Sequence, residues 1–118
     1  MNDAAAAATD ALRTLTAEAF DPLIGASLTL ADDADGRLEV TLADVKRHPA
    51  ARHKQDARMP FSLLLYSPAN RVAAAGRYFL CHESLPALPP LHVMPVINPG
   101  APADEEGRTM VTYQVIVN

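Results

Sequence analysis

The sequence predicts a mainly β (α+β) domain, in which an N-terminal helix precedes a roughly six-stranded antiparallel meander that forms a small barrel or sandwich. Three observations support this fold class. The first residues are rich in alanine and leucine, apolar and polar residues alternate from Ile24 onward, and turn-forming residues separate the apolar runs. With 118 residues, of which 49% are hydrophobic and 20% charged, we expect a single domain over 1–118, with a helical segment over 1–19 and a β domain over 20–118.

The helix is expected over residues 3–18, which contain neither glycine nor proline. Ala8, Leu12 and Leu15 form a narrow apolar stripe at helical spacing, which fits against a sheet. Pro22 ends the helix, because it restricts the preceding residue to extended conformations.

The first hairpin is predicted from the alternation in residues 24–30 and 38–42. A three-residue loop places the apolar residues of both strands on one face, and it pairs Leu30 with Val40. Gly36 ends this loop in the left-handed position that such loops require.

The later strands are expected at residues 61–66, 77–82, 91–97 and 111–117. Residues 61–66 are apolar on both faces, as in a central strand, and residues 77–82 are expected to be largely buried. Pro95 places part of its strand at an edge or a bulge. In the last strand, the odd-numbered residues are apolar and are expected to face the core. Residues 46–58 show no period and are predicted to be a long polar connection.

Several segments together resemble a family of small bacterial proteins that is a domain of unknown function, over roughly residues 15–118. The matching pieces are Phe20–Gly25, Arg58–Leu64 with its central Pro-Phe-Ser-Leu-Leu motif, Gly76–His82, Met94–Val96 and Tyr113–Asn118. The chain departs from the family pattern after His82, where Glu83–Pro86 replaces a proline and a Leu-Gly pair. The resemblance implies a small β domain without assigned catalysis, and an association with phage-tail-collar-like proteins.

His82 and His92 are the first candidates for a metal site. If residues 84–90 close a simple hairpin, the two histidines face each other with β-carbons about 4.5–5.5 Å apart. Zinc normally takes three or four protein ligands, and no third ligand shares that face. Cys81 points to the opposite side and is expected to fill the core. We therefore predict that the chain binds no metal.

The sequence also contains no motif that is typical of a catalytic nucleophile or of a cofactor site. Ser62 lies inside a strand without a Gly-x-Ser-x-Gly elbow, and the five glycines never cluster into a phosphate-binding loop. The acidic residues gather in loops 32–35 and 104–106, where we expect water to keep their pKa values ordinary. The first loop resembles part of a calcium loop but lacks both anchoring carboxylates, so a solvated hairpin tip is expected. We predict no catalytic residue and no cofactor.

One charge feature stands out, because residues 46–58 hold half of the basic residues. These are Lys46, Arg47, Arg52, Lys54 and Arg58. The segment could contact an acidic partner or a phosphate, or it could simply keep a β protein soluble. It contains no aromatic residue for base stacking, and the net charge of −4 gives no general attraction to nucleic acid or to anionic membranes.

Three function classes remain. We expect a non-catalytic structural or adaptor domain that acts through protein–protein contacts, in a phage-tail-like assembly if the resemblance extends to function. A small-molecule-binding barrel is the alternative, and an enzyme is the least favoured. An open meander would expose a strand edge, through which two copies could form a homodimer. Residues 4–8 are too few for an export signal or a membrane span, so a cytoplasmic location is expected.

Overall fold

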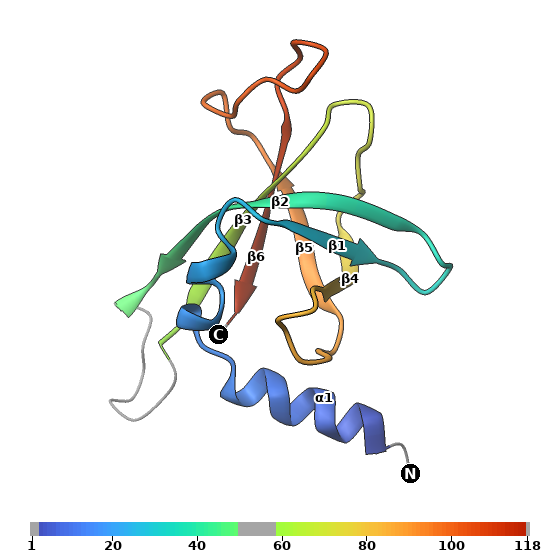
Figure 1. The fold of residues 1–118 in the computed structure, drawn as a ribbon, viewed down its shortest axis with the longest axis vertical. Coiled ribbons are helices and arrows are strands. Elements are labelled where there is room, and N and C mark those ends of the chain that lie inside the picture. The colour runs from blue at the N-terminus through green and yellow to red at the C-terminus, as the bar shows by residue number, and fades with distance from the viewer. Residues whose placement is uncertain (1–2, 50–58, 118) are drawn as a thin grey trace.

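A computed structural model describes residues 3–49 and 59–117 of the chain. Within these residues lie one α-helix, two 3₁₀ helices and six strands (Figure 1). They are α1 (Asp3–Thr14), η1 (Ala17–Ala19), η2 (Asp21–Leu23), β1 (Ser27–Ala31), β2 (Arg37–Arg47), β3 (Phe61–Ser67), β4 (Gly76–Cys81), β5 (Leu91–Val96) and β6 (Val111–Val117). The prediction of a mainly β fold with an N-terminal helix is confirmed.

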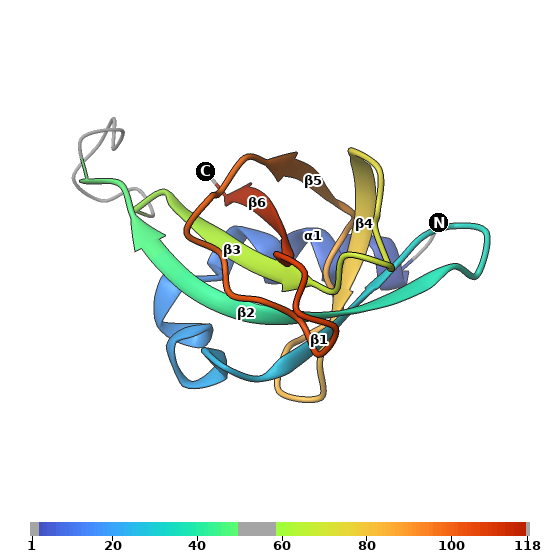
Figure 2. The same ribbon diagram turned by 90° about the horizontal axis from the view of Figure 1, so that it is seen from above.

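The strands form a closed antiparallel barrel in the order β1-β2-β3-β6-β5-β4. Seen from above, they surround a common interior (Figure 2). β4 returns to lie beside β1 after three consecutive strands, and β3 lies beside β6. Each arrangement is a Greek key, which corrects the predicted meander. Because the barrel closes between β1 and β4, it lacks the free edge that an open meander would offer.

The β1–β2 hairpin has a different register from the predicted one. Leu30 lies opposite Leu38, not Val40, although the apolar residues of both strands still share one face. The connecting tip runs from Asp32 to Gly36, and it is closed by a 3.0 Å hydrogen bond from the Asp32 N–H to the Gly36 carbonyl. The expected three-residue loop is therefore wrong.

The side chain of Asp32 explains this longer tip. Its Oδ1 accepts hydrogen bonds from the backbone N–H groups of Ala34 at 2.9 Å and Gly36 at 2.7 Å. The left-handed residue is Asp35, with φ of 64°, and not Gly36. Gly36 matters for a different reason, because a β-carbon there would lie 2.6 Å from Asp32 Oδ2 and would force the Asp32 side chain to shift.

β2 extends further than the sequence indicates. It carries a bulge between Leu42 and Asp44, which shifts the buried position to Val45 and interrupts the alternation. The strand continues to Arg47, and the His48 N–H donates to the Pro60 carbonyl at 2.8 Å. Residues 46 and 47 thus belong to the sheet, which corrects the predicted connection over 46–58.

The barrel interior is filled by apolar side chains. Those that are at most 1% exposed include Leu28, Leu30, Leu42, Phe61, Leu63, Leu65, Val93, Tyr113 and Val115. β3 pairs with β2 on one side and β6 on the other, as predicted for a central strand. Tyr113, Val115 and Val117 are buried and Val111 packs partly against them, so the prediction for the last strand is confirmed.

Helix α1 ends at Thr14, earlier than predicted. Leu15, Ala17, Phe20 and Leu23 are buried, and two short 3₁₀ helices turn these side chains into one end of the barrel. The Phe20 ring lies 5.8 Å from that of Phe61. α1 itself lies below the barrel (Figure 1). None of the described helices has the length and apolar character needed to cross a membrane.

β4 and β5 share a short ladder, in which Gly76 pairs with Val93 and Tyr78 with Leu91. Beyond it β5 has no β4 partner, so Pro95 lies at the predicted edge position. Of the β4 residues only Leu80 is buried, which corrects the expectation of a largely buried strand.

Candidate functional site

The predicted basic contact segment is only partly described. Lys46 is exposed on β2. Arg47 donates a 2.6 Å hydrogen bond to Asp21 and lies 3.6 Å from Glu18. The Asp21 carboxylate raises the pKa of the Arg47 guanidinium, and this contact ties the 3₁₀ turns to the end of β2. The other three residues, Arg52, Lys54 and Arg58, lie outside the described residues, so an anion or partner contact of this segment stays a prediction.

His82 and His92 do not face each other, which corrects the predicted register. His92 lies opposite Arg77 of β4. His82 follows the end of β4, where its Nδ1 accepts a hydrogen bond from the Ser84 N–H at 3.0 Å. The two histidines are separated because the chain between β4 and β5 forms a longer, asymmetric connection and not a simple hairpin. Within the described ranges, no group of three or more His, Cys, Asp or Glu side chains is placed to hold a metal ion.

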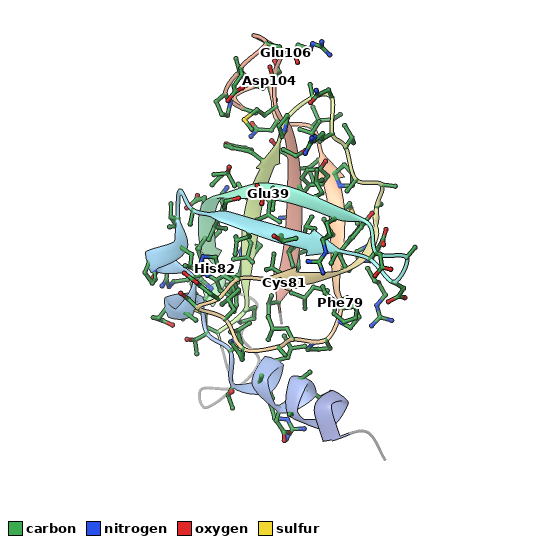
Figure 3. The ribbon with its side chains drawn as sticks, turned by 45° about the vertical axis from the view of Figure 1, so that its right-hand side comes forward. Glu39, Phe79, Cys81, His82, Asp104 and Glu106 are labelled. Carbon is green, nitrogen blue, oxygen red and sulfur yellow. The ribbon has the colours of Figure 1, made fainter. Side chains whose placement is uncertain are left out.

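Cys81 is exposed, so the expectation that it fills the core is wrong. It pairs with Thr29 of β1, which in turn pairs with Glu39 of β2, and this row lies on the outer surface (Figure 3). The inward position next to it belongs to Leu80.

A serine–histidine contact was not predicted from the sequence. His48 Nε2 lies 2.9 Å from Ser62 Oγ. The β2–β3 pairing brings these residues together from positions fourteen apart, so no local motif indicates the contact. Ser62 is fully buried, and a nucleophile must be reached by its substrate, so the contact satisfies a buried hydroxyl and offers no reactive one.

Asp104 corrects the expectation of an ordinary solvated carboxyl in the 104–106 loop. Its Oδ2 accepts a hydrogen bond from the Ala69 N–H at 3.0 Å. Its Oδ1 accepts from the N–H groups of Glu106 at 2.9 Å and Arg108 at 3.0 Å. These hydrogen bonds lower the pKa of Asp104, and the bond from the Ala69 N–H has the largest effect. The carboxylate therefore joins two loops at one end of the barrel (Figure 3).

The outer surface of β3, β6 and β5 has no aspartate, glutamate, lysine or arginine at its outward positions, and we call it the uncharged face. These positions are Ser62, Leu64, Tyr66, His92, Met94, Val96, Thr112, Gln114 and Ile116, of which Ser62 and Thr112 are buried and His92, Met94 and Ile116 are exposed. Met94 lies opposite Gln114, which lies opposite Leu64, so one row crosses all three strands. Ile116 and Met94 are 58% and 47% exposed.

The other side of the barrel differs in charge. There the outward positions of β4, β1 and the first half of β2 include Arg77, Arg37 and Glu39. Single exposed apolar residues are ordinary, but a surface on adjacent strands that has no charged residue and exposes Met94 and Ile116 is a candidate contact site. Sequence reasoning missed this face because its members are spread over residues 62–116 and come together only through the barrel order.

These features define a small closed Greek-key barrel with one uncharged outer face. The chain belongs to the family described as "Domain of unknown function (DUF6916)", whose model matches residues 15–117. The match contains both 3₁₀ helices and all six described strands, and it leaves α1 outside. The predicted resemblance is thus confirmed at the level of a domain of unknown function. No curated protein and no solved structure matches the chain.

Proposed function

We propose that this protein is a non-catalytic structural or adaptor domain that acts through protein–protein contacts, and that its first partner is a second copy of itself. The uncharged face is the observation that carries this proposal. Covering exposed apolar side chains such as Ile116 and Met94 contributes about 25 cal/mol per Å² removed from water. A centre without charged residues and a polar rim are the usual anatomy of a protein interface.

The charges beside the face favour a second copy. Asp44 and Lys46 are exposed on β2, opposite Leu64 and Ser62 of the face. Within the described residues neither side chain forms an ion pair. A two-fold axis that runs across the strands between these two rows brings Asp44 of one copy to the partner's Lys46, and the reverse. Such self-complementarity is what a two-fold interface requires.

The candidate reactive groups support a binding role. Ser62 is buried and bonded to His48, and Arg47 is paired with Asp21. Asp104 is occupied by backbone N–H groups. General acid–base catalysis needs a titratable group within reach of a substrate, and each of these groups is engaged in holding the fold. The resemblance to phage-tail-collar-associated proteins suggests a tail-like assembly as the setting for repeated copies.

Analytical ultracentrifugation of the full chain tests the proposal. We expect a dimer that Ile116→Glu and Met94→Glu each dissociate, because a carboxylate buried in an apolar interface lacks a partner. Ile24→Glu is the matched control, since Ile24 is 46% exposed but lies outside the uncharged face. Circular dichroism must show that all three variants remain folded.

Two results contradict the proposal. One is a wild-type chain that stays monomeric at the highest concentrations reached. The other is a dimer that Ile24→Glu dissociates as strongly as the face variants, which would place the interface elsewhere. A monomer that turns over a substrate, with turnover abolished by one histidine or aspartate substitution, would establish an enzyme instead.

A further inference from the structure

One end of the barrel opens into a pocket of about 370 Å³ between the β1–β2 hairpin and the loop that precedes β4. Leu30, Leu38 and Tyr78 line it, together with Ala73 of the loop. Leu30 and Ala73 are buried, whereas Leu38 and Tyr78 are partly exposed, so the pocket has an apolar floor at the barrel mouth. Ligand sites are often found at barrel mouths and typically measure about 300–1,000 Å³.

Two arginines lie at this mouth. Arg37 begins β2, Arg71 belongs to the loop, and both are exposed and line the pocket. Neither guanidinium forms an ion pair with another described residue. Asp32 is the acidic residue that lines the pocket, and its Oδ1 already accepts two backbone hydrogen bonds. The lining therefore carries more positive than negative charge, in a chain whose net charge is −4.

Hydrogen bonds hold the walls of the pocket in place. The Tyr78 hydroxyl donates to the Ala74 carbonyl at 2.7 Å. Ser67 Oγ donates to the Arg71 carbonyl at 2.8 Å, and the Ala73 N–H donates to the Tyr113 hydroxyl at 3.0 Å. A binding group on a fixed backbone loses less freedom when a ligand arrives.

We infer that the barrel mouth binds a small organic anion. Its phosphate or carboxylate group contacts Arg37 and Arg71, and its apolar or aromatic body lies on Leu30, Leu38 and Tyr78. Guanidinium groups present paired donors that match both kinds of anion. This site differs from the interior cavity expected of a ligand-binding barrel, because the interior is filled. It is independent of the proposed dimer, since it lies outside the uncharged face.

Nuclear magnetic resonance titration of the ¹⁵N-labelled full chain tests the inference. Phenyl phosphate and benzoate carry the two anions on one aromatic ring, inorganic phosphate lacks the ring, and benzyl alcohol lacks the anion. We expect phenyl phosphate or benzoate to bind more tightly than the last two probes, with shifts in the amides of Gly36, Arg37 and residues 71–74. The tighter of the two identifies the anion. Added salt should weaken its binding.

Arg37→Gln and Arg71→Gln should each weaken binding of that probe at least about tenfold, since a charge-assisted hydrogen bond is lost. Arg77→Gln is the control, because Arg77 is an exposed arginine that does not line the pocket. The inference is overturned if neither aromatic anion binds, if the shifts map elsewhere, or if Arg77→Gln has the same effect. If inorganic phosphate binds as tightly as the aromatic anions, the apolar residues of the pocket do not contribute to binding and that part of the inference is overturned.

Discussion

Two aspartates organise loops, and each accepts backbone hydrogen bonds through its side-chain carboxylate. Asp32 bonds to Ala34 and Gly36 in the β1–β2 tip. Asp104 bonds to three N–H groups from two loops. Acidic residues in turns are visible in the sequence, but the atoms to which they bond are not. This is why the hairpin tip and the pKa of Asp104 differ from the predictions.

Gly36→Ala should destabilise the domain by about 1–2 kcal/mol, because the new β-carbon would displace the Asp32 carboxylate from its two N–H donors. Urea denaturation measures the loss. Gly100→Ala is the control, since a β-carbon there would lie 3.5 Å from its nearest neighbour, Asn98 Oδ1, in ordinary contact. Equal stability of Gly36→Ala and wild type would show that the tip does not depend on Asp32.

Asp104→Asn should lower the melting temperature at neutral pH, because an amide nitrogen cannot accept the hydrogen bond that one carboxylate oxygen receives. The native pKa of Asp104 lies below its ordinary value of 3.8, so its contribution is present above that value. The contribution is lost as the pH falls through the lower, native pKa. The difference in melting temperature between variant and wild type should therefore shrink in acid.

Asp33→Asn is the matched control for this pH dependence, because Asp33 is an exposed residue of the other acidic loop. It should leave the melting temperature unchanged across the same range. A constant difference between Asp104→Asn and wild type at every pH would contradict the role given to the ionised carboxylate.

At the scale of the elements, β6 pairs with β3 along its whole length and with β5 on its other side, and its inward side chains Tyr113, Val115 and Val117 are buried. Burying each of its inward side chains contributes about 1.5–3 kcal/mol, and a domain of this kind has a total stability of about 5–15 kcal/mol. A chain that ends at Thr109 should therefore not fold. Circular dichroism and thermal unfolding measure this outcome.

A chain that begins at Leu15 is the contrasting truncation. It lacks α1, which lies outside the family match, and keeps the buried residues of the 3₁₀ turns. It should remain folded, with a slightly lower melting temperature, because Ala11 and Leu12 pack partly against the core. If both truncated chains unfold, or if both remain folded, then β6 and α1 do not differ in their contribution to the core as predicted.

The positions of the strands were largely predictable from the sequence, whereas the pairing between strands was not. Alternation of apolar residues located the strands, and turn residues located their ends. The last residues of β2 were not predicted, because the bulge between Leu42 and Asp44 changes the alternation of apolar residues and no local sequence motif indicates it. A run of apolar residues suggested that β4 and Cys81 are buried, although burial there depends on the neighbouring strand and not on the run itself.

For the whole molecule, barrel closure decides which surfaces are available. The β1–β4 and β3–β6 pairings join strands distant in the sequence, and no residue pattern in this chain specifies them. These pairings remove the edge expected to support a homodimer, and they assemble the uncharged face and the arginine-lined mouth instead. Of the residues in the proposed contacts, the sequence singled out only Lys46, as part of the basic segment whose own contact stays a prediction, and it indicated neither the uncharged face nor the arginine-lined mouth.

The proposed two-fold pairing makes a prediction that only this arrangement satisfies. Asp44→Lys places a lysine opposite the partner's Lys46, and Lys46→Asp places an aspartate opposite the partner's Asp44. Each single variant should raise the dimer dissociation constant about tenfold, because the contact occurs twice and an exposed ion pair contributes about 0.2–1 kcal/mol. The double variant exchanges the charges and should restore the wild-type constant. Sedimentation equilibrium at low salt measures all four chains, and a double variant no tighter than the single ones would exclude the Asp44–Lys46 contact between copies.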